Sequence, residues 1–569
     1  METGKQVNTN KNAVLSTGVP VYLSTSSRVL LWLLPLSFLV IAFFYPLSRI
    51  LALTFDFHTF TSQNILLSFR VLIFTFYQAT FSTLLTLLLG LLSAYLFARY
   101  DFRGKSFLRA LTAVPFMLPT VVVAAGFSAL LGRRGLIHTI FPLSSFPFIG
   151  TLWAILIAHV FYNTTIIIRV VGNALSSLDP KLEAAARSLG ADSFHVWWNV
   201  IFPLLRTSLL ASSLLVFLFD FTSFGVILLL GGSQFATLEV EIYLRVLKLP
   251  NPSLAALLSV IQLLCTLMIS LVYSRVVTRS TVQTAPRSAE SNLRKPKTLR
   301  ERLFVISFAI LLSSFFLLPL SALPLRSLFR LEADRGQRGE IQYGLTTDYY
   351  TELFINRRGS VFYVPPIQAT VNSLGYAGAT VVLSLVLGFP AAFALAKPTR
   401  LEKVLDPLII LPLGSSAVML GLGFIISFGA WLSSPLLVPF AHTLVALPFV
   451  IRTLQPAIAS IPQRLRQAAS SLGASPWDVW KNIDLPILRR AILTAGIFAF
   501  TISLGEFGAT LLISRPEYPT IPVAIERFLS QPGGLNYGQA MAMATILMLL
   551  TLASILLIER FRIPGSGEF

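Results

Sequence analysis

Two stretches of this 569-residue sequence are near copies of each other: LDPKLEAAARSLGADSFHVWWNVIFP at 178–203 and IPQRLRQAASSLGASPWDVWKNIDLP at 461–486. Gly190 and Gly473 occupy matching places in them and stand 283 residues apart. The same separation relates further residues on both sides: His159 and His442, Arg169 and Arg452, Trp197 and Trp480, Pro203 and Pro486, Arg206 and Arg489, and Phe224-Gly225 and Phe507-Gly508. A register that stays constant across loops as well as apolar segments indicates an internal duplication.

Long apolar blocks surround both stretches and indicate a membrane protein. Hydrophobic residues make up 55% of the chain and charged residues 12%, with a mean hydropathy of +0.75, whereas soluble domains carry about 25% charged residues. Apolar blocks of about 20 residues are long enough to cross a bilayer. We therefore predict an all-α, polytopic membrane protein with about 12 transmembrane helices. The predicted spans are 29–53, 66–98, 108–131, 151–172, 207–231, 253–277, 303–325, 367–396, 404–430, 436–458, 490–514 and 539–561.

The basic residues flank the apolar blocks and predict which loops face the cytoplasm. The net charge of +19 lies in clusters beside the spans, as in cytoplasmic loops of membrane proteins, and not in an aromatic-rich polar segment. It therefore does not indicate nucleic-acid binding. The polar, basic segment 278–302 is predicted to be a cytoplasmic linker, and the nearly charge-balanced loop 326–365 is predicted to be external. The terminal segments 1–28 and 562–569 are then cytoplasmic.

The linker divides the chain into a first half at 29–277 and a second half at 303–561. Each half holds six predicted spans, which is an even number, so the two copies cross the membrane in the same direction. They are parallel repeats related by an axis along the membrane normal, and not inverted repeats. Two six-helix bundles that face each other across a central pore are the simplest architecture of this kind.

The two quoted stretches follow the fourth and tenth spans and have the features of a docking element. In each, an alanine-rich helical run ends at a glycine suited to a C-terminal cap. Small alanines let another protein approach closely, and a helix that carries tryptophan follows near the membrane interface before Pro203 or Pro486 begins the next span. Ordinary cytoplasmic connectors are the alternative, but a duplicated connector of this length disfavours it.

These stretches resemble the EAA loop of type I ABC importer permeases. In that family each loop forms a coupling helix that fits into a groove of an ATPase subunit, and two fused halves are typical of the thiamine and ferric-iron permeases. The family glutamate usually stands six residues before the glycine, whereas here that position holds Ala184, one residue after Glu183, and Gln467 in the second half. The resemblance implies these coupling residues: Glu183, Ala185, Ala186, Gly190, Pro203, Gln467, Ala468, Ala469, Gly473 and Pro486.

The resemblance also implies the partners, the location and the solute. The partners are two ATP-binding cassette subunits at the cytoplasmic face, an extracytoplasmic substrate-binding protein and the lipid bilayer. The location is the bacterial inner membrane. The segments 224–232, 237–243 and 255–263 look most like the thiamine branch, whereas Gly-Glu-Phe-Gly-Ala-Thr at 505–510 is similar to a wider set that includes iron permeases. Thiamine and ferric iron are therefore the implied candidate solutes.

Two carboxylates, Asp220 and Glu506, lie inside the predicted fifth and eleventh spans. Ionisable groups at such depth usually face a bundle interior or a water-filled cavity. Asp220 corresponds to Ser503, and Glu506 stands three residues further on, nearly on the same helical face. The two carboxylates are then expected to converge on the central axis and line the path of a cationic solute. Packing against a neighbouring span is the equally weighted alternative.

The remaining sequence gives no sign of an enzyme. The only Gly-Lys-Ser is Gly104-Lys105-Ser106, and Arg99 stands where a phosphate-binding loop needs glycine. Five histidines and the single Cys265 form neither a metal-ligand pattern nor a catalytic triad, so no cofactor is expected. Two alternatives stay open: an ion-gradient-driven secondary transporter, which more often has inverted repeats, and a non-transporting assembly protein, which needs no duplicated docking loop.

Overall fold

The computed structural model describes residues 25–55, 59–140, 148–279, 293–331, 344–356 and 364–561. The predicted tail at 562–569 and most of the N-terminal segment lie outside the described residues. The predicted linker and external loop are described only in part.

The described part of the first half is helical. Its elements are α1 (Thr25–Leu39), a π-helical turn (Val40–Phe44), α2 (Tyr45–Thr54), α3 (Ser62–Arg99), α4 (Lys105–Met117), α5 (Thr120–Leu131), α6 (Leu136–Ile140), α7 (Leu152–Ser177), α8 (Pro180–Ser188), α9 (Ser193–Val196), α10 (Phe202–Phe221), α11 (Gly225–Leu230), α12 (Leu238–Leu247) and α13 (Pro252–Arg279).

The second half repeats this order from α7 onward with the 283-residue register. Before that point it adds a short antiparallel pair of strands, β1 (Phe329–Arg330) and β2 (Gly344–Leu345). Its helices are α14 (Leu299–Leu328), α15 (Asp348–Thr351), α16 (Gln368–Leu395), α17 (Arg400–Gly414), α18 (Ala417–Phe428), α19 (Leu437–Ala459), α20 (Gln463–Ser471), α21 (Pro476–Val479), α22 (Leu485–Gly505), α23 (Gly508–Ile513), α24 (Ile521–Leu529) and α25 (Gly534–Phe561).

The predicted all-α membrane fold is confirmed. Among the described residues, eleven helices are long and apolar enough to cross a bilayer. The pair α17 and α18, bent by 95° at a short break, makes twelve if it counts as one broken span.

Four predicted continuous spans, at 108–131, 207–231, 404–430 and 490–514, are wrong as single helices because each is broken. Pro119 separates α4 from α5, since proline lacks an N–H and forces Leu118 into an extended conformation. Extended backbone at Ser415 and Ser416 separates α17 from α18. The breaks between α10 and α11 and between α22 and α23 fall just before the repeated Phe-Gly pairs. The sequence stays apolar around the α4–α5 break, and α17 and α18 are apolar enough together to cross a membrane, so composition alone does not reveal these two breaks. The other two breaks contain Thr222 and Ser223 or Glu506.

Within the described residues, three π-helical turns precede prolines. They cover Val40–Phe44, Trp197–Ile201 and Trp480–Asp484, and the next helix after each has proline at its second position. A proline ring inside a helix clashes with the carbonyl four residues earlier and donates no hydrogen bond. The chain responds by widening one turn, so that the N–H of Phe202 bonds to the carbonyl of Trp197 and that of Leu485 to Trp480. Pro203 and Pro486 therefore set the same wide turn in both halves.

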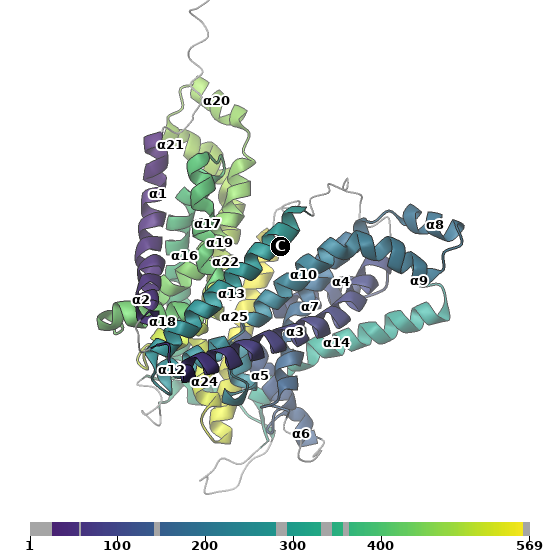
Figure 1. The fold of residues 1–569 in the computed structure, drawn as a ribbon, viewed down its shortest axis with the longest axis horizontal. Coiled ribbons are helices and arrows are strands. Elements are labelled where there is room, and N and C mark those ends of the chain that lie inside the picture. Colours follow the sequence, from purple (N-terminus) through teal and green to yellow (C-terminus); the bar gives the residue numbers. More distant parts are fainter. Residues whose placement is uncertain are drawn as a thin grey trace, which may run out of the picture.

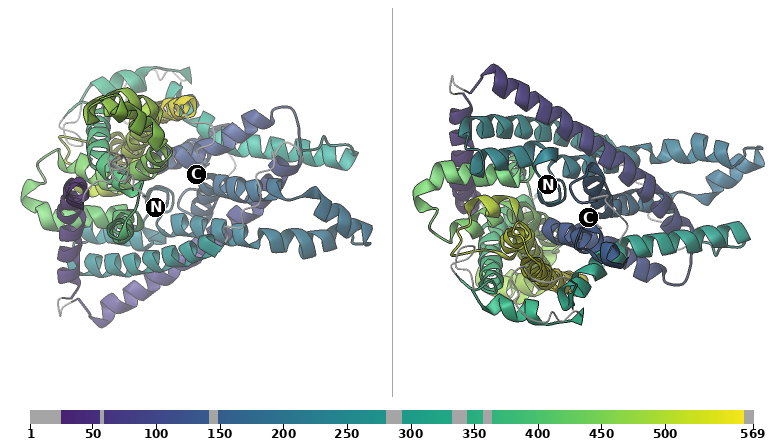
Figure 2. Two further views of the ribbon diagram at one scale, coloured as in Figure 1. Left: turned by 90° about the horizontal axis from the view of Figure 1, so that it is seen from above. Right: turned by 90° about the horizontal axis from the view of Figure 1, so that it is seen from below.

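The first span of each half packs on the other half. Helix α1 packs on α16 of the second half, whereas α14 packs on α4 and α5 of the first half and also on α25 of its own half. Figure 1 shows the purple α1 among the green helices of one arm and the teal α14 beside α3 and α4 of the other. The two arms diverge from a common centre: in Figure 2 one is seen nearly end on while the other runs across the page.

Arginine contacts fix both exchanged spans. At the start of α1, Arg28 Nη1 lies 3.2 Å from Glu402 Oε1 and donates to the Lys397 carbonyl at the α16–α17 turn. Before α14, the Arg294 backbone exchanges hydrogen bonds with Arg99 and Asp101 at the α3–α4 turn. The described end of the linker therefore lies at the same end of the molecule as α8, which follows α7 there.

Each arm is built around three packed helices, α3, α7 and α10 in one and α16, α19 and α22 in the other. Glycines let these helices approach closely. A Cβ on Gly90 of α3 would lie 2.6 Å from Ile167 of α7, and one on Gly388 of α16 would lie 2.8 Å from Val450 of α19. Small residues at helix contacts are the usual way to pack helices tightly in a membrane.

Candidate functional site

Both predicted coupling helices, α8 and α20, end in the same capped turn. Gly190 has φ +89° and Gly473 φ +84°, a left-handed conformation that favours glycine. The N–H of Ala191 bonds to the Ala186 carbonyl at 3.1 Å, and the N–H of Ala474 bonds to Ala469 at 3.1 Å. This six-to-one hydrogen bond is the Schellman cap, so glycine is required by the backbone in both halves.

The two coupling helices contribute no buried residue to this chain's core. Ala185 and Ala468 are exposed, and Ala186 and Ala469 are half-buried. The leucines before the two glycines are the most exposed large apolar side chains described, Leu189 at 89% and Leu472 at 88%. An apolar side chain held this far from its own chain at two equivalent positions indicates a surface that another protein covers.

The structure places the polar coupling candidates differently in the two halves. The Glu183 carboxylate pairs with Arg99 at the end of α3, so it braces α8 against its own bundle. Gln467 is exposed. Its neighbour Arg466, which is the true repeat equivalent of Glu183, donates to Asp484 Oδ1 at 2.8 Å. Both loops are thus tied to their own arm by an ion pair.

The segment after each glycine turns back toward the membrane through a short helix, α9 or α21. Asp192 and Ser475 cap these helices, accepting from the N–H of His195 at 2.8 Å and of Asp478 at 3.2 Å. The hydrogen bonds from the His195 backbone and ring lower the pKa of the exposed Asp192 carboxyl. Pro203 and Pro486 follow at the exposed start of the next helix.

Asp220 lies fully buried in the centre of the first arm. Its Oδ1 accepts from Asn163 Nδ2 at 2.7 Å and lies 3.4 Å from Nδ1 of His159. The other ring nitrogen of His159 lies 2.9 Å from the Ser223 hydroxyl. Gln78 of α3 donates to the Asp220 carbonyl at 2.9 Å. These bonds tie α3, α7 and α10 together.

Glu506 occupies the break between α22 and α23 in the second arm. Its two oxygens accept from the N–H groups of Ala509 at 2.9 Å and Thr510 at 3.0 Å, so the carboxylate caps α23. The Thr510 hydroxyl also donates to it, and Nε2 of His442 lies 3.3 Å away. The other ring nitrogen of His442 lies 2.7 Å from the Ser503 hydroxyl.

The expected convergence of Asp220 and Glu506 on the central axis is not seen in their bonding. Within the part of the chain that the structure describes, the hydrogen bonds of each carboxylate stay inside its own half. The repeated phenylalanines do meet between the halves, because the rings of Phe224 and Phe507 stack with centroids 5.4 Å apart. A role for the two carboxylates in the pathway stays a prediction.

Sequence reasoning did not single out Glu239, a buried carboxylate of α12 that is 1% exposed. A usable signal was present. Glu241, two residues later, has Arg245 one turn away and pairs with it at 2.7 Å, whereas Glu239 has Tyr243 at that position. An acidic residue in an apolar segment without a basic neighbour on its own helix needs a partner from elsewhere.

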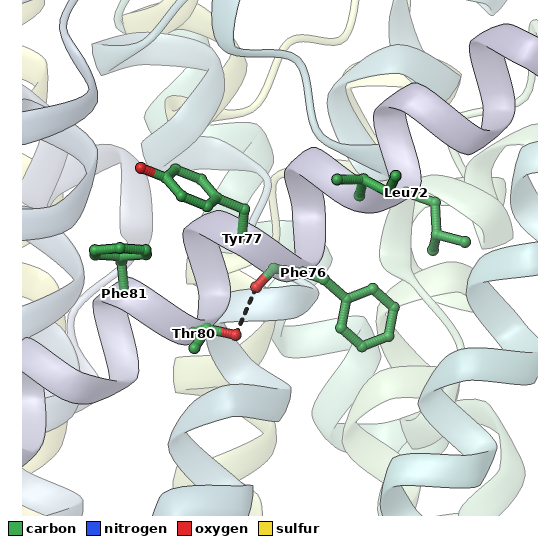
Figure 3. Close-up of a pocket in the computed structure, with 6 residues that line it drawn as sticks. Leu72, Phe76, Tyr77, Thr80 and Phe81 are labelled. Atoms are coloured by element: carbon green, nitrogen blue, oxygen red, sulfur yellow. Dashed lines mark hydrogen bonds between the residues drawn. The ribbon is translucent and has the colours of Figure 1, made fainter.

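A shallow groove on α3 does not have the chemistry of a solute site. It is lined by Leu72, Ile73, Phe76, Tyr77, Thr80 and Phe81. Figure 3 shows these side chains on one helix, with the Thr80 hydroxyl donating to the Phe76 carbonyl of the same helix at 2.8 Å. A surface of this kind suits lipid chains and offers no group for a charged solute.

A chain whose two halves repeat the same order of membrane-spanning helices, each with an exposed alanine–glycine loop, has the architecture of a duplicated membrane permease. The sequence profile of the binding-protein-dependent transport system inner membrane component family matches it twice, at residues 86–282 and 384–562. The chain belongs to this family. It is a multi-pass subunit of an ABC importer, located in the inner membrane, with two permease halves fused in one polypeptide.

The chain is also similar over most of its length to individual family members. The thiamine transport system permease protein ThiP of Brucella abortus (strain 2308) is 29% identical over 500 residues, which cover 86% of this chain and 87% of the relative. ThiP of Escherichia coli (strain K12) is 27% identical over 513 residues, or 88% and 89% of the two chains. The probable ABC transporter permease protein y4fN of Sinorhizobium fredii is 25% identical over 512 residues, or 87% and 88%. The predicted resemblance to a fused two-half ABC importer permease is confirmed.

Proposed function

We propose that this permease moves a small cationic solute, with thiamine as the first candidate, into the cytoplasm. An extracytoplasmic binding protein delivers the solute. Two ATP-binding cassette subunits drive the movement, one on the loop formed by α8 and α9 and one on the loop formed by α20 and α21. This chain supplies the path and hydrolyses no ATP itself.

The matched exposure of Leu189 and Leu472 carries the proposal for the ATPase partners. An exposed leucine that becomes fully buried contributes about 1.5–3 kcal/mol, so two equivalent leucines are a sizeable part of a docking contact. The family membership supports partners of this class, and the relatives named as thiamine permeases support the solute.

Replacement of both leucines by serine tests the docking. Neither leucine packs on this chain, so we expect L189S/L472S to insert normally and to lose most co-purifying ATPase and at least about tenfold in uptake, given the burial lost. L345S is a matched control, because Leu345 is 78% exposed in β2, away from the loops. Stoichiometric co-purification with unchanged uptake in the double variant would refute the assignment.

Reconstituted uptake tests the solute and the energy source together. Vesicles that hold the permease, its ATPase subunits and its binding protein are given thiamine or ferric iron. We expect ATP-dependent uptake of thiamine. Uptake of iron in place of thiamine would contradict the solute, and uptake driven by an ion gradient without ATP would favour a secondary transporter.

A further inference from the structure

The 95° break between α17 and α18 lies in the second half, but the first half completes its hydrogen bonding. A helix end leaves carbonyl and N–H groups without partners, and in a membrane these need protein partners. Thr266 of α13 donates to the Gly414 carbonyl at the end of α17, at 2.7 Å. Glu239 of α12 accepts from the Ser416 hydroxyl at 2.6 Å and from the N–H of Val418 at the start of α18. The two halves therefore share this break.

The Glu239 carboxylate is held by dipoles and not by a cation. Its other oxygen accepts from Nε2 of Gln262 at 2.6 Å. Among the described residues, no lysine, arginine or histidine pairs with it, although it is 1% exposed. In the part of the chain that the structure describes, its partners are the N-terminus of α18 and two neutral donors, Ser416 and Gln262. A helix N-terminus favours a negative charge, but more weakly than a cation in direct contact.

This arrangement has no counterpart at the other break. The repeat equivalents of Glu239, Gln262 and Thr266 are Pro522, Thr545 and Leu549. At the α4–α5 break, where the carbonyl of Leu118 needs a partner, the donor is the Tyr162 hydroxyl of the same half, at 3.0 Å. The contact made by Glu239 is therefore not a general requirement of a broken span. It is a carboxylate contact from α12 of one half to α18 of the other, beside the bond from Thr266 to Gly414 at the same break.

Glu239 lies close to the place where the halves meet. Tyr243, one helical turn further along α12, packs its ring on Phe224 with centroids 5.6 Å apart. Phe224 in turn stacks on its repeat equivalent Phe507. Two equivalent residues can touch only near the axis that relates the repeats. Glu239 is thus one turn of helix from a residue that packs on the ring at that axis.

We propose that Glu239 acts as a latch between the halves. Its carboxylate binds either the N-terminus of α18 or the cationic solute. In the closed arrangement it caps α18. When the halves move apart for transport, the carboxylate loses the donors of α18 and becomes an uncompensated charge beside the pathway, which is costly until a cation replaces them. A cationic solute in the path supplies that charge, so its arrival favours the open arrangement. The inference rests on the proposed function in one respect, namely that the solute is cationic.

Two variants of Glu239 separate its charge from its capping. E239Q keeps the length and an oxygen that accepts from Ser416 and Val418, but it has no charge. E239D keeps the charge but is one methylene shorter, so it reaches α18 poorly. If the charge receives the solute, E239D transports better than E239Q. If the residue only caps α18, the order is reversed.

The experiment measures ATP-dependent thiamine uptake by the complete transporter in vesicles. We expect E239Q to lose about tenfold or more, as for a lost charge-assisted hydrogen bond, with E239D within about threefold of the unaltered chain. E241Q is the matched control and should transport normally, because Glu241 pairs with Arg245 on its own helix.

A variant of Ser416, the partner of Glu239 before α18, also tests the latch. S416A removes one donor to Glu239 without altering its charge, and we expect higher ATP hydrolysis in the absence of solute, with uptake retained. Uptake by E239Q equal to the unaltered chain, or better than E239D, overturns the proposal. Failure of the unaltered chain to import thiamine refutes the proposed solute instead, so the two failures are distinguishable.

Discussion

His159 and His442 occupy the same place in the two repeats, yet the carboxylate approaches them from opposite ring nitrogens. Asp220 lies near Nδ1 of His159, with Ser223 at Nε2, whereas Ser503 lies at Nδ1 of His442, with Glu506 at Nε2. Positions 220 and 503 are equivalent, as are 223 and 506, so carboxylate and hydroxyl have changed places.

The exchange shows what the duplicated bundle retains. Each arm keeps one histidine beside one carboxylate at its centre, with a hydroxyl at both ring nitrogens: Ser82 and Ser223 for His159, Ser503 and Thr510 for His442. Hydrogen bonds of this kind between helices hold the arm together. The position of the carboxylate then determines which further hydrogen bonds it makes. Glu506 caps α23, whereas Asp220 leaves its Oδ2 without a hydrogen-bond partner among the described residues.

The largest effect is expected where the two halves are alike. A glycine follows both α8 and α20, and apart from its chain neighbours no described residue lies within 4 Å of a Cβ on Gly190 or Gly473. G190D/G473D adds about 1–2 kcal/mol of backbone strain per site and puts a charge into the proposed ATPase contact, so uptake should be lost while membrane insertion stays normal. G190A/G473A carries the strain without the charge and should retain part of the activity. Co-purification of ATPase with transport intact in the aspartate variant would contradict the docking.

The two buried carboxylates should differ in what they contribute to stability. An amide at 506 has only one acceptor oxygen for the two N–H groups that Glu506 now accepts, so E506Q should cost about 2–3 kcal/mol. An amide at 220 can keep the bond from Asn163 and turn its NH₂ toward the unpartnered side, so D220N should cost less than about 1 kcal/mol. Thermal unfolding of the detergent-solubilised variants measures this difference. A larger loss of thermal stability in D220N than in E506Q would contradict the proposed difference between the two carboxylates.

The same variants test the pathway prediction. D220N/E506Q keeps the shape of both side chains, and if they line the path the uptake rate changes with normal expression. Unchanged uptake kinetics would leave both residues with a packing role, which their bonding within each half favours.

The arginines that fix the exchanged spans predict a smaller asymmetry. Arg28 and Glu402 are buried, and R28A leaves the carboxylate without its cation, at a cost of about 2 kcal/mol. The side chain of Arg294 is 56% exposed in its pair with Glu301, so R294A should cost less than about 1 kcal/mol. Equal effects of the two variants on the thermal midpoint would show that burial is not what separates them.

No change in activity is expected from the variants that test topology. With Cys265 replaced by serine, an impermeant thiol reagent on intact cells should label T347C in the external loop and label K297C in the linker only after lysis. The reverse pattern would invert the orientation.

Much of this architecture could be predicted from the sequence, because span positions follow from hydropathy and the repeat from a constant register. The glycine caps after α8 and α20 could also be predicted, since Gly190 and Gly473 follow alanine-rich runs. Three features could not. The break at Ser415–Ser416 leaves the apolar pattern intact, the exchange of α1 and α14 concerns which helices are neighbours, and the partner of Glu239 stands 177 residues away at Ser416. Each depends on contacts between distant segments, and these contacts cannot be inferred from local composition.

The exchange of α1 and α14 imposes an order on synthesis. The ribosome completes α1 at residue 39, but α16, on which it packs, is not made until residues 368–395. At about 5–20 residues per second, α1 waits in the membrane for roughly 15–60 s without its final neighbour. The first arm is likewise incomplete until α14, which follows the linker, has been synthesised. Neither half can therefore finish folding before part of the other exists, and fusion into one polypeptide guarantees that the awaited helix always arrives in the same membrane and in equal number.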